Sequence, residues 1–191
     1  MVTLAMLRPL SLIGLVTALA TCSSDGVSVT RQQTMTSDLG PHVRMLASSG
    51  EVQTLVYENP LPQDTGNAAV RTAMASAPVY PRLRYTETRP AADAYGYRVV
   101  VGFGDWPAGG DSYCRNPELR PRPAAADVTV VTAALCVGNS VLSEAAARSP
   151  RIQGSGDPRL NALMGTVVQA LLAQNDRMRL RAPGMGFGIN L

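Results

Sequence analysis

The side chains able to do nucleophilic or metal chemistry are few in this chain. There are three cysteines, Cys22, Cys114 and Cys136, and one histidine, His42. All 17 basic residues are arginine, because the sequence contains no lysine. A Schiff-base lysine, a lysine-containing phosphate loop and a Ser-Lys dyad are therefore excluded. A single histidine also excludes a metal site built from several histidine ligands. The chemistry that remains is mainly that of the thiols.

Cys22 lies at the end of a segment with the layout of an export signal. Arg8 precedes an apolar run, Leu10–Ala20, and polar residues begin directly after Cys22. A short charged region, a short apolar region and small residues before a cleavage point are typical of a secretory signal. The run is too short to be a transmembrane helix, which needs roughly 20 apolar residues. Translation from Met1 or from Met6 gives the same mature chain.

The four residues Leu19-Ala20-Thr21-Cys22 resemble the lipobox of a bacterial lipoprotein signal. Leu19 and Ala20 fit that pattern, and Thr21 departs from the usual Gly, Ala or Ser. The resemblance implies that the Cys22 thiol carries diacylglycerol, that cleavage removes residues 1–21, and that acylation, as with palmitate, anchors the chain. Ser23 in place of Asp favours the outer over the inner membrane, facing the periplasm. An ordinary secretory signal with an incidental cysteine remains the alternative.

Cys114 and Cys136 are predicted to form a disulfide. They are an even pair in a chain with an export signal, and export leads to an oxidising compartment. Their spacing fits no zinc pattern, and two ligands do not make a metal site. A bridge between them closes a loop of about twenty residues, which contributes roughly 3 kcal/mol when unstrained.

Composition restricts the partners. With 17 basic and 14 acidic residues the chain has a net charge of +3. This charge is too mild to indicate a nucleic acid or another polyanion. No dinucleotide fingerprint or Gly-x-Ser-x-Gly motif occurs, so no cofactor is predicted. The partners that remain are the lipid bilayer, through acylated Cys22, and an envelope protein complex.

The chain is expected to divide into four parts. Residues 1–21 are the cleaved signal, and residues 22–48 are the lipidated cysteine with a polar, Ser- and Thr-rich tether. Short edge strands within the tether are possible around Val29 and from His42 to Leu46, and His42 itself is expected to be solvated. Residues 49–176 form the folded domain, and residues 177–191 form a glycine-containing flexible tail.

Alternation and turn residues predict five strands and two helices in the domain. The triplet Val99-Val100-Val101 favours a strand that is covered on both faces. The expected strands are 52–57, 82–86, 97–103, 128–137 and 141–147, and the expected helices are 68–75 and 158–172. This pattern predicts an α+β fold: a single small domain with an antiparallel or mixed sheet of about five strands and two helices packed on one face.

The last helix and the hairpin before it are the clearest elements. Asp157 is a good N-cap, Pro158 suits the first helical position, and apolar residues follow at helical spacing from Leu160 to Leu172. Gly138-Asn139 is a two-residue hairpin turn, which pairs residue 137 with residue 140. An unbroken ladder from that pair places Glu144 on a solvent face. The opposite face is then expected to meet the helix through a set of small residues: Val128, Val130, Ala134, Cys136, Val141 and Ala145.

Three surface groups are candidate sites. The long loop 104–126 carries Trp106 and Tyr113, which could anchor a partner from an exposed position or pack over the sheet edge. Arg82 and Arg84 alternate outward on a strand and could meet lipid headgroups, or could form an ordinary solvated face. The acidic residues of the loop, Asp105 and Asp111, could bind a metal, although they lack the ligand spacing of a calcium loop.

Residues 97–172 resemble, in the order of their elements, the accessory lipoproteins of envelope ABC-type transport systems. This resemblance implies a fold and no specific activity. The favoured function is a membrane-anchored, non-enzymatic periplasmic lipoprotein that binds a protein or lipid partner. The alternatives are a periplasmic hydrolase or metal-dependent enzyme that uses the acidic residues of loop 104–126, and a purely structural lipoprotein.

Overall fold

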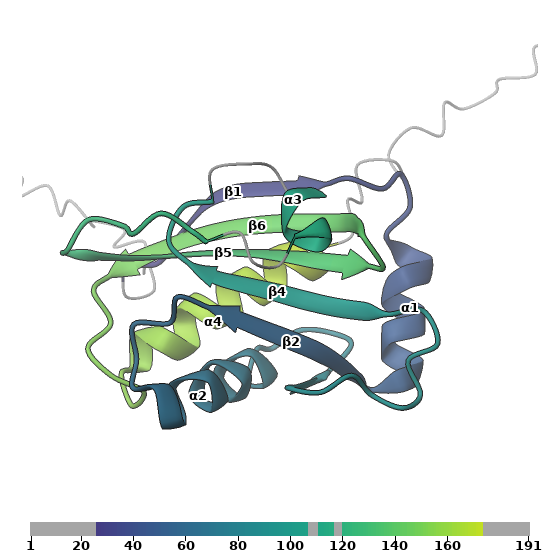
Figure 1. The fold of residues 1–191 in the computed structure, drawn as a ribbon, viewed down its shortest axis with the longest axis horizontal. Coiled ribbons are helices and arrows are strands. Elements are labelled where there is room, and N and C mark those ends of the chain that lie inside the picture. Colours follow the sequence, from purple (N-terminus) through teal and green to yellow (C-terminus); the bar gives the residue numbers. More distant parts are fainter. Residues whose placement is uncertain (1–25, 107–110, 117–119, 174–191) are drawn as a thin grey trace, which may run out of the picture.

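The structure, a computed structural model, describes residues 26–106, 111–116 and 120–173. These residues form an α+β domain with one mixed sheet of six strands and four helices (Figure 1). The predicted fold class is confirmed, with one strand and two helices more than expected. The elements are β1 (Ser28–Thr34), α1 (Gly40–Ser49), β2 (Glu51–Tyr57), α2 (Gln63–Ala75), β3 (Arg84–Thr86), β4 (Tyr97–Phe103), α3 (Asp111–Arg115), β5 (Val128–Val137), β6 (Ser140–Pro150) and α4 (Pro158–Leu172).

The strands lie in the order β1-β6-β5-β4-β2-β3. β2 is parallel to both β3 and β4, whereas the pairs β4–β5, β5–β6 and β6–β1 are antiparallel. The strand with three consecutive valines, β4, lies inside the sheet, and all three valines are buried. The inference that this strand is covered on both faces is therefore correct.

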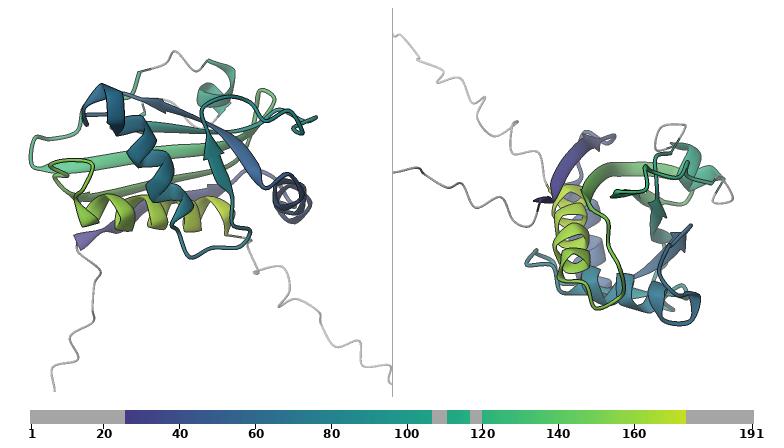
Figure 2. Two further views of the ribbon diagram at one scale, coloured as in Figure 1. Left: turned by 90° about the horizontal axis from the view of Figure 1, so that it is seen from below. Right: turned by 90° about the vertical axis from the view of Figure 1, so that its left-hand side faces the viewer.

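Helices α4 and α2 cover one face of the sheet, whereas the short α3 lies on the other (Figure 2, right). α4 begins as the sequence predicts, because the Asp157 carboxylate accepts a hydrogen bond of 3.0 Å from the Arg159 amide. Its apolar residues from Leu160 to Leu172 are buried in the main core. Burying a leucine in such a core contributes roughly 1.5–3 kcal/mol relative to exposing it.

Part of the predicted tether belongs to the folded domain. β1 pairs with β6, and α1 buries Val43 and Leu46. The side chains of β1 are mostly exposed, so its sequence shows no apolar alternation, and the strand is held by its backbone hydrogen bonds to β6. The segment from His42 to Leu46 is helical rather than extended. His42 is held in place, with its Nδ1 atom 2.9 Å from the Tyr97 hydroxyl.

The β5–β6 hairpin has an irregularity that reverses the predicted faces. Cys136 pairs with Val141, but Leu135 pairs with Ser143, so Leu142 is an extra residue on β6. Such a β-bulge shifts every later pair by one residue, which exchanges the two faces. The face that meets α4 therefore carries Val131, Ala133 and Leu135 of β5. Of the residues predicted to meet the helix, Ala134, Cys136 and Val141 lie on the α3 side instead, whereas Ala145 does lie in the main core with α4. The unbroken ladder assumed from the turn is wrong.

Candidate functional site

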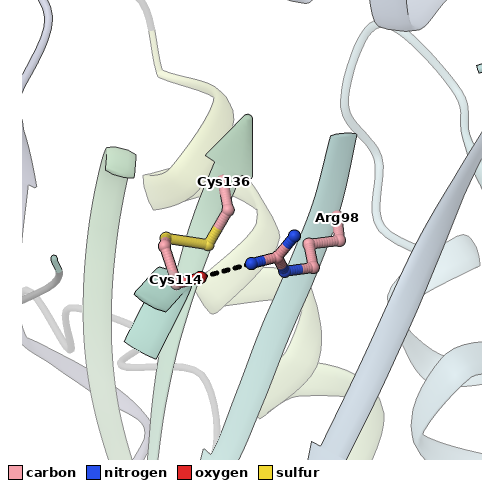
Figure 3. Close-up of a disulfide and its surroundings, with 3 residues drawn as sticks. All are labelled: Arg98, Cys114 and Cys136. Carbon is pink, nitrogen blue, oxygen red and sulfur yellow. Dashed lines mark hydrogen bonds between the residues drawn. A yellow bond between two sulfur atoms is a disulfide. The ribbon is translucent and has the colours of Figure 1, made fainter. Parts of the chain in front are cut away.

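The predicted disulfide is present. Cys114 on α3 and Cys136 on β5 are bonded, with their Cα atoms 5.7 Å apart (Figure 3). The Arg98 guanidinium, on the neighbouring β4, donates a hydrogen bond to the Cys114 carbonyl. The bridge and this hydrogen bond tie the middle of the long loop to two adjacent strands.

Trp106 and Tyr113 of this loop are packed against the sheet rather than exposed. Trp106 is 6% exposed and Tyr113 is 1% exposed. Their ring centroids are 3.8 Å apart in an edge-to-face arrangement, and the Trp106 ring lies directly over the backbone of Gly102. Of the two arrangements open from the sequence, the structure has the packed one. Neither ring is available on the surface as a partner anchor.

A buried carboxylate lies beside these rings. Glu144 is 1% exposed and forms an ion pair with Arg31 of the edge strand β1. Burial, together with the charge of Glu144, raises the pKa of Tyr113 to about 12. Sequence reasoning placed Glu144 on a solvent face because it did not foresee that α3 covers the face of the sheet away from α4. The arrangement neutralises a buried charge, which is a structural role.

The predicted arginines lie on the surface at the other edge of the sheet. Arg82 and Arg84 are both exposed, and Arg84 forms an ion pair with Glu51 on the neighbouring strand. They are far in the sheet order from the disulfide-tied loop, so the structure does not join these candidate groups into one site. The pairing of Arg84 reduces the free positive charge of this patch.

The acidic residues of the long loop form no metal centre within the described chain. Asp105 is exposed, and its backbone pairs with that of Arg122. The side chain of Asp111 lies outside the described part. Among the residues that the structure describes, no three His, Cys, Asp or Glu side chains lie close enough together to hold a metal ion. Likewise, no described helix has the length and apolar character needed to cross a membrane.

A hollow on the described surface was not predicted from the sequence. It is an open pocket of about 570 Å³ at the end of the sheet where β4 ends and β5 begins. Loops that follow β2, β4 and β6 meet there, and the floor is formed by Leu61, Phe103 and Ile152, each no more than 6% exposed. The walls include proline rings and a run of three alanines: Pro60, Pro62, Pro121, Pro123, Ala124, Ala125 and Ala126.

Two charged residues line this pocket, Glu58 and Arg151. Glu58 carries an ion pair of 3.4 Å to Arg120, and the exposed Arg151 places its guanidinium 3.4 Å from the Ala126 carbonyl. Glu58 also has a left-handed backbone, with φ of 52°, which is unusual for a residue other than glycine. The lining as a whole is somewhat more apolar than polar, and a mixed lining of this kind can receive a small amphipathic molecule. No sequence motif marks it, because its residues come from three separate loops and the strand ends beside them.

The chain matches no family model and no curated protein. Among solved structures, it is similar to two structures of the PelC dodecamer from Paraburkholderia phytofirmans, in space groups C2 and P6. The identity is 17% in both, over 78% of this chain and 98% or 99% of those chains, with TM-scores of 0.41 and 0.42. A likeness at this level carries no argument about the function of this chain.

Proposed function

We propose that this protein is a lipid-anchored domain of a bacterial cell envelope, acylated at Cys22, that binds a protein or lipid partner and catalyses no reaction. The observation that carries the proposal is the Cys114–Cys136 disulfide, which holds α3 against the sheet. Structural disulfides persist in oxidising compartments such as the periplasm. The bridge therefore supports the export that the lipobox-like signal predicts on independent grounds.

The proposal places the domain on the periplasmic side, with the outer membrane favoured by Ser23. The arrangement of the described residues supports binding rather than chemistry. Two of the buried polar side chains are engaged within the fold: Glu144 forms an ion pair with Arg31, and Thr129 accepts a 2.9 Å hydrogen bond from the Ile152 amide. The surface feature best suited to a ligand is the pocket at the sheet end, whose interior is mainly apolar.

The anchor is tested by metabolic labelling with radioactive palmitate. The full-length protein should incorporate the label and fractionate with membranes, and Cys22→Ser should abolish both. Ser24→Ala is the matched control, because it lies two residues from the cysteine and leaves the thiol in place. Labelling that persists in Cys22→Ser, or cleavage at the same bond, contradicts the proposal.

A further inference from the structure

The chain enters the domain beside the pocket. A Cβ built on Gly26 would lie 3.3 Å from the Pro150 ring, so the first described residue contacts the last residue of β6. Pro150 pairs with Val128, which lines the pocket. Figure 1 shows the same arrangement, with β1 beginning at the end of the sheet where β6 finishes. The amino-terminal entry point and the pocket therefore share one end of the molecule.

The short connection to Cys22 fixes which end is near the membrane. Four residue steps separate Cys22 from Gly26, and they span at most about 14 Å. The opposite end of the sheet is much farther away, because the 11 residues of β6 extend for about 35 Å. If Cys22 is acylated as proposed above, the pocket end of the domain lies next to the bilayer and the β5–β6 turn lies away from it.

The chemistry of the pocket end matches a membrane lipid. The interior presents Leu61, Phe103 and Ile152, and a volume of about 570 Å³ lies within the usual range for small-molecule sites. Exposed Arg151 lines the pocket, and exposed Arg122 and Arg148 lie at the same end of the sheet, together with two acidic residues, Glu58, which is paired with Arg120, and Asp127. Arginines close to a bilayer attract lipid phosphates, by about 1 kcal/mol for each residue near an anionic surface.

We propose that this pocket binds one acyl chain of an anionic phospholipid from the membrane that holds the protein. The chain occupies the space above Leu61 and Ile152, and the phosphate lies toward Arg151. This inference rests on the proposed anchor for its orientation, whereas the apolar interior and its arginine rim are features of the domain itself. The occupant is a lipid of the bilayer and not the protein's own acyl chain, because the latter must stay in the bilayer to anchor the domain.

The test uses the lipidated full-length mature protein in vesicles that contain phosphatidylglycerol with a photoactivatable group at the end of one acyl chain. Irradiation followed by mass spectrometry should place the adducts on the peptides that contain Leu61, Ala125 and Ile152. Ala125→Trp fills the pocket from an exposed position and should lower this labelling about tenfold or more, because each displaced methylene weakens binding about fourfold. Ala91→Trp is the matched control, since Ala91 is also exposed but lies in the loop before β4, at the far end.

A second variant distinguishes the contribution of the lipid headgroup to binding from that of the acyl chain. Arg151→Glu should reduce labelling by phosphatidylglycerol and leave labelling by a diacylglycerol probe with the same acyl chain, which has no phosphate, nearly unchanged. Equal melting temperatures of the variants and the parent exclude a general loss of folding. Adducts confined to other surfaces, or pocket labelling that neither Ala125→Trp nor Arg151→Glu reduces, would overturn the inference while leaving the lipid anchor intact.

The proposal of a lipid anchor and the proposal of an acyl-chain pocket are refuted by different results. If palmitate labelling is absent, the proposed anchor is wrong, and the unanchored protein is then given the same photoactivatable vesicles. Pocket adducts in that sample still support an acyl-chain site, and their absence overturns it. Pocket adducts that emerge only after Cys22→Ser would mean that the protein's own chain fills the pocket, which overturns the choice of a bilayer lipid.

Discussion

The substitution Gly102→Ala should displace the only tryptophan from its buried position. A Cβ at residue 102 would lie 2.1 Å from Trp106 Nε1 and 2.4 Å from Cε2. Non-bonded atoms cannot approach so closely, so either the ring or the backbone must move. The ring has little freedom to move aside, because it packs edge-to-face against both Tyr113 and Tyr57. Cys114, adjacent to Tyr113, is tied to the sheet by the disulfide.

The size of the effect follows from the burial of the ring. If the added methyl group expels Trp106 completely, the loss approaches that of deleting a buried tryptophan, about 3–5 kcal/mol. Partial relaxation of β4 makes the expected loss of unfolding free energy about 2–4 kcal/mol. Gly165→Ala is the matched control. It adds the same methyl group in the middle of α4, where the new Cβ would have no described neighbour within 4 Å apart from the adjacent backbone of its own helix, and it should stabilise the domain by about 1 kcal/mol.

The assay combines urea denaturation with tryptophan fluorescence. The chain has a single tryptophan, so the emission spectrum reports the position of Trp106 alone. Gly102→Ala should shift the emission to longer wavelength and increase quenching by acrylamide, whereas Gly165→Ala should change neither. A Gly102→Ala protein with native emission and native stability would refute the packing of Trp106 on Gly102.

Three further predictions concern the core, the disulfide and the last helix. Leu163→Ala should reduce the unfolding free energy by roughly 2–5 kcal/mol in denaturation, and a loss below about 1 kcal/mol would contradict its burial in the core. A thiol probe should label Cys114 and Cys136 only after reduction, and Cys136→Ala should cost about 2–5 kcal/mol; equal labelling before reduction would show free thiols. Hydrogen bonds from Arg159 hold the pKa of Asp157 well below its usual range, so Asp157→Ala should destabilise the domain at neutral pH. That difference should disappear as the pH falls through the folded-state pKa, and a difference independent of pH in thermal melts would exclude the ionised cap.

The elements with strong local patterns could be predicted from the sequence. The three consecutive valines identified β4, and its observed bounds agree with the predicted 97–103. Asp157 and Pro158 marked the start of α4, because both have intrinsic preferences for their positions. The disulfide followed from the export signal and the even number of remaining thiols. In each case the information lies within a few neighbouring residues.

Features that depend on distant residues could not be predicted. A short edge strand around Val29 was left open by the sequence and is present as β1, but its extent to Thr34 depends on hydrogen bonds with β6, because its own residues carry no apolar alternation. The bulge at Leu142 has no residue signature, yet it decides which residues of β5 share a face with Glu144. The pocket combines loops separated by more than 90 residues, from Glu58 to Gln153. Trp106 gave no local indication of whether it packs inward or outward, and the fit on Gly102 decided it.

The covering of the sheet explains why a binding site is expected at its end. α4 and α2 occupy one face, and the disulfide-tied loop with Trp106 and Tyr113 occupies the other, so neither face of the central strands can receive a ligand. At the end where β4 finishes, the chain instead passes through several prolines, and a proline offers no amide hydrogen for a further strand ladder. Loops that cannot extend the sheet meet there without filling the space between them, and they leave an apolar hollow above Leu61 and Ile152. The same residues that terminate the sheet thus form the pocket, and the entry of the chain at Gly26 brings that pocket within reach of Cys22.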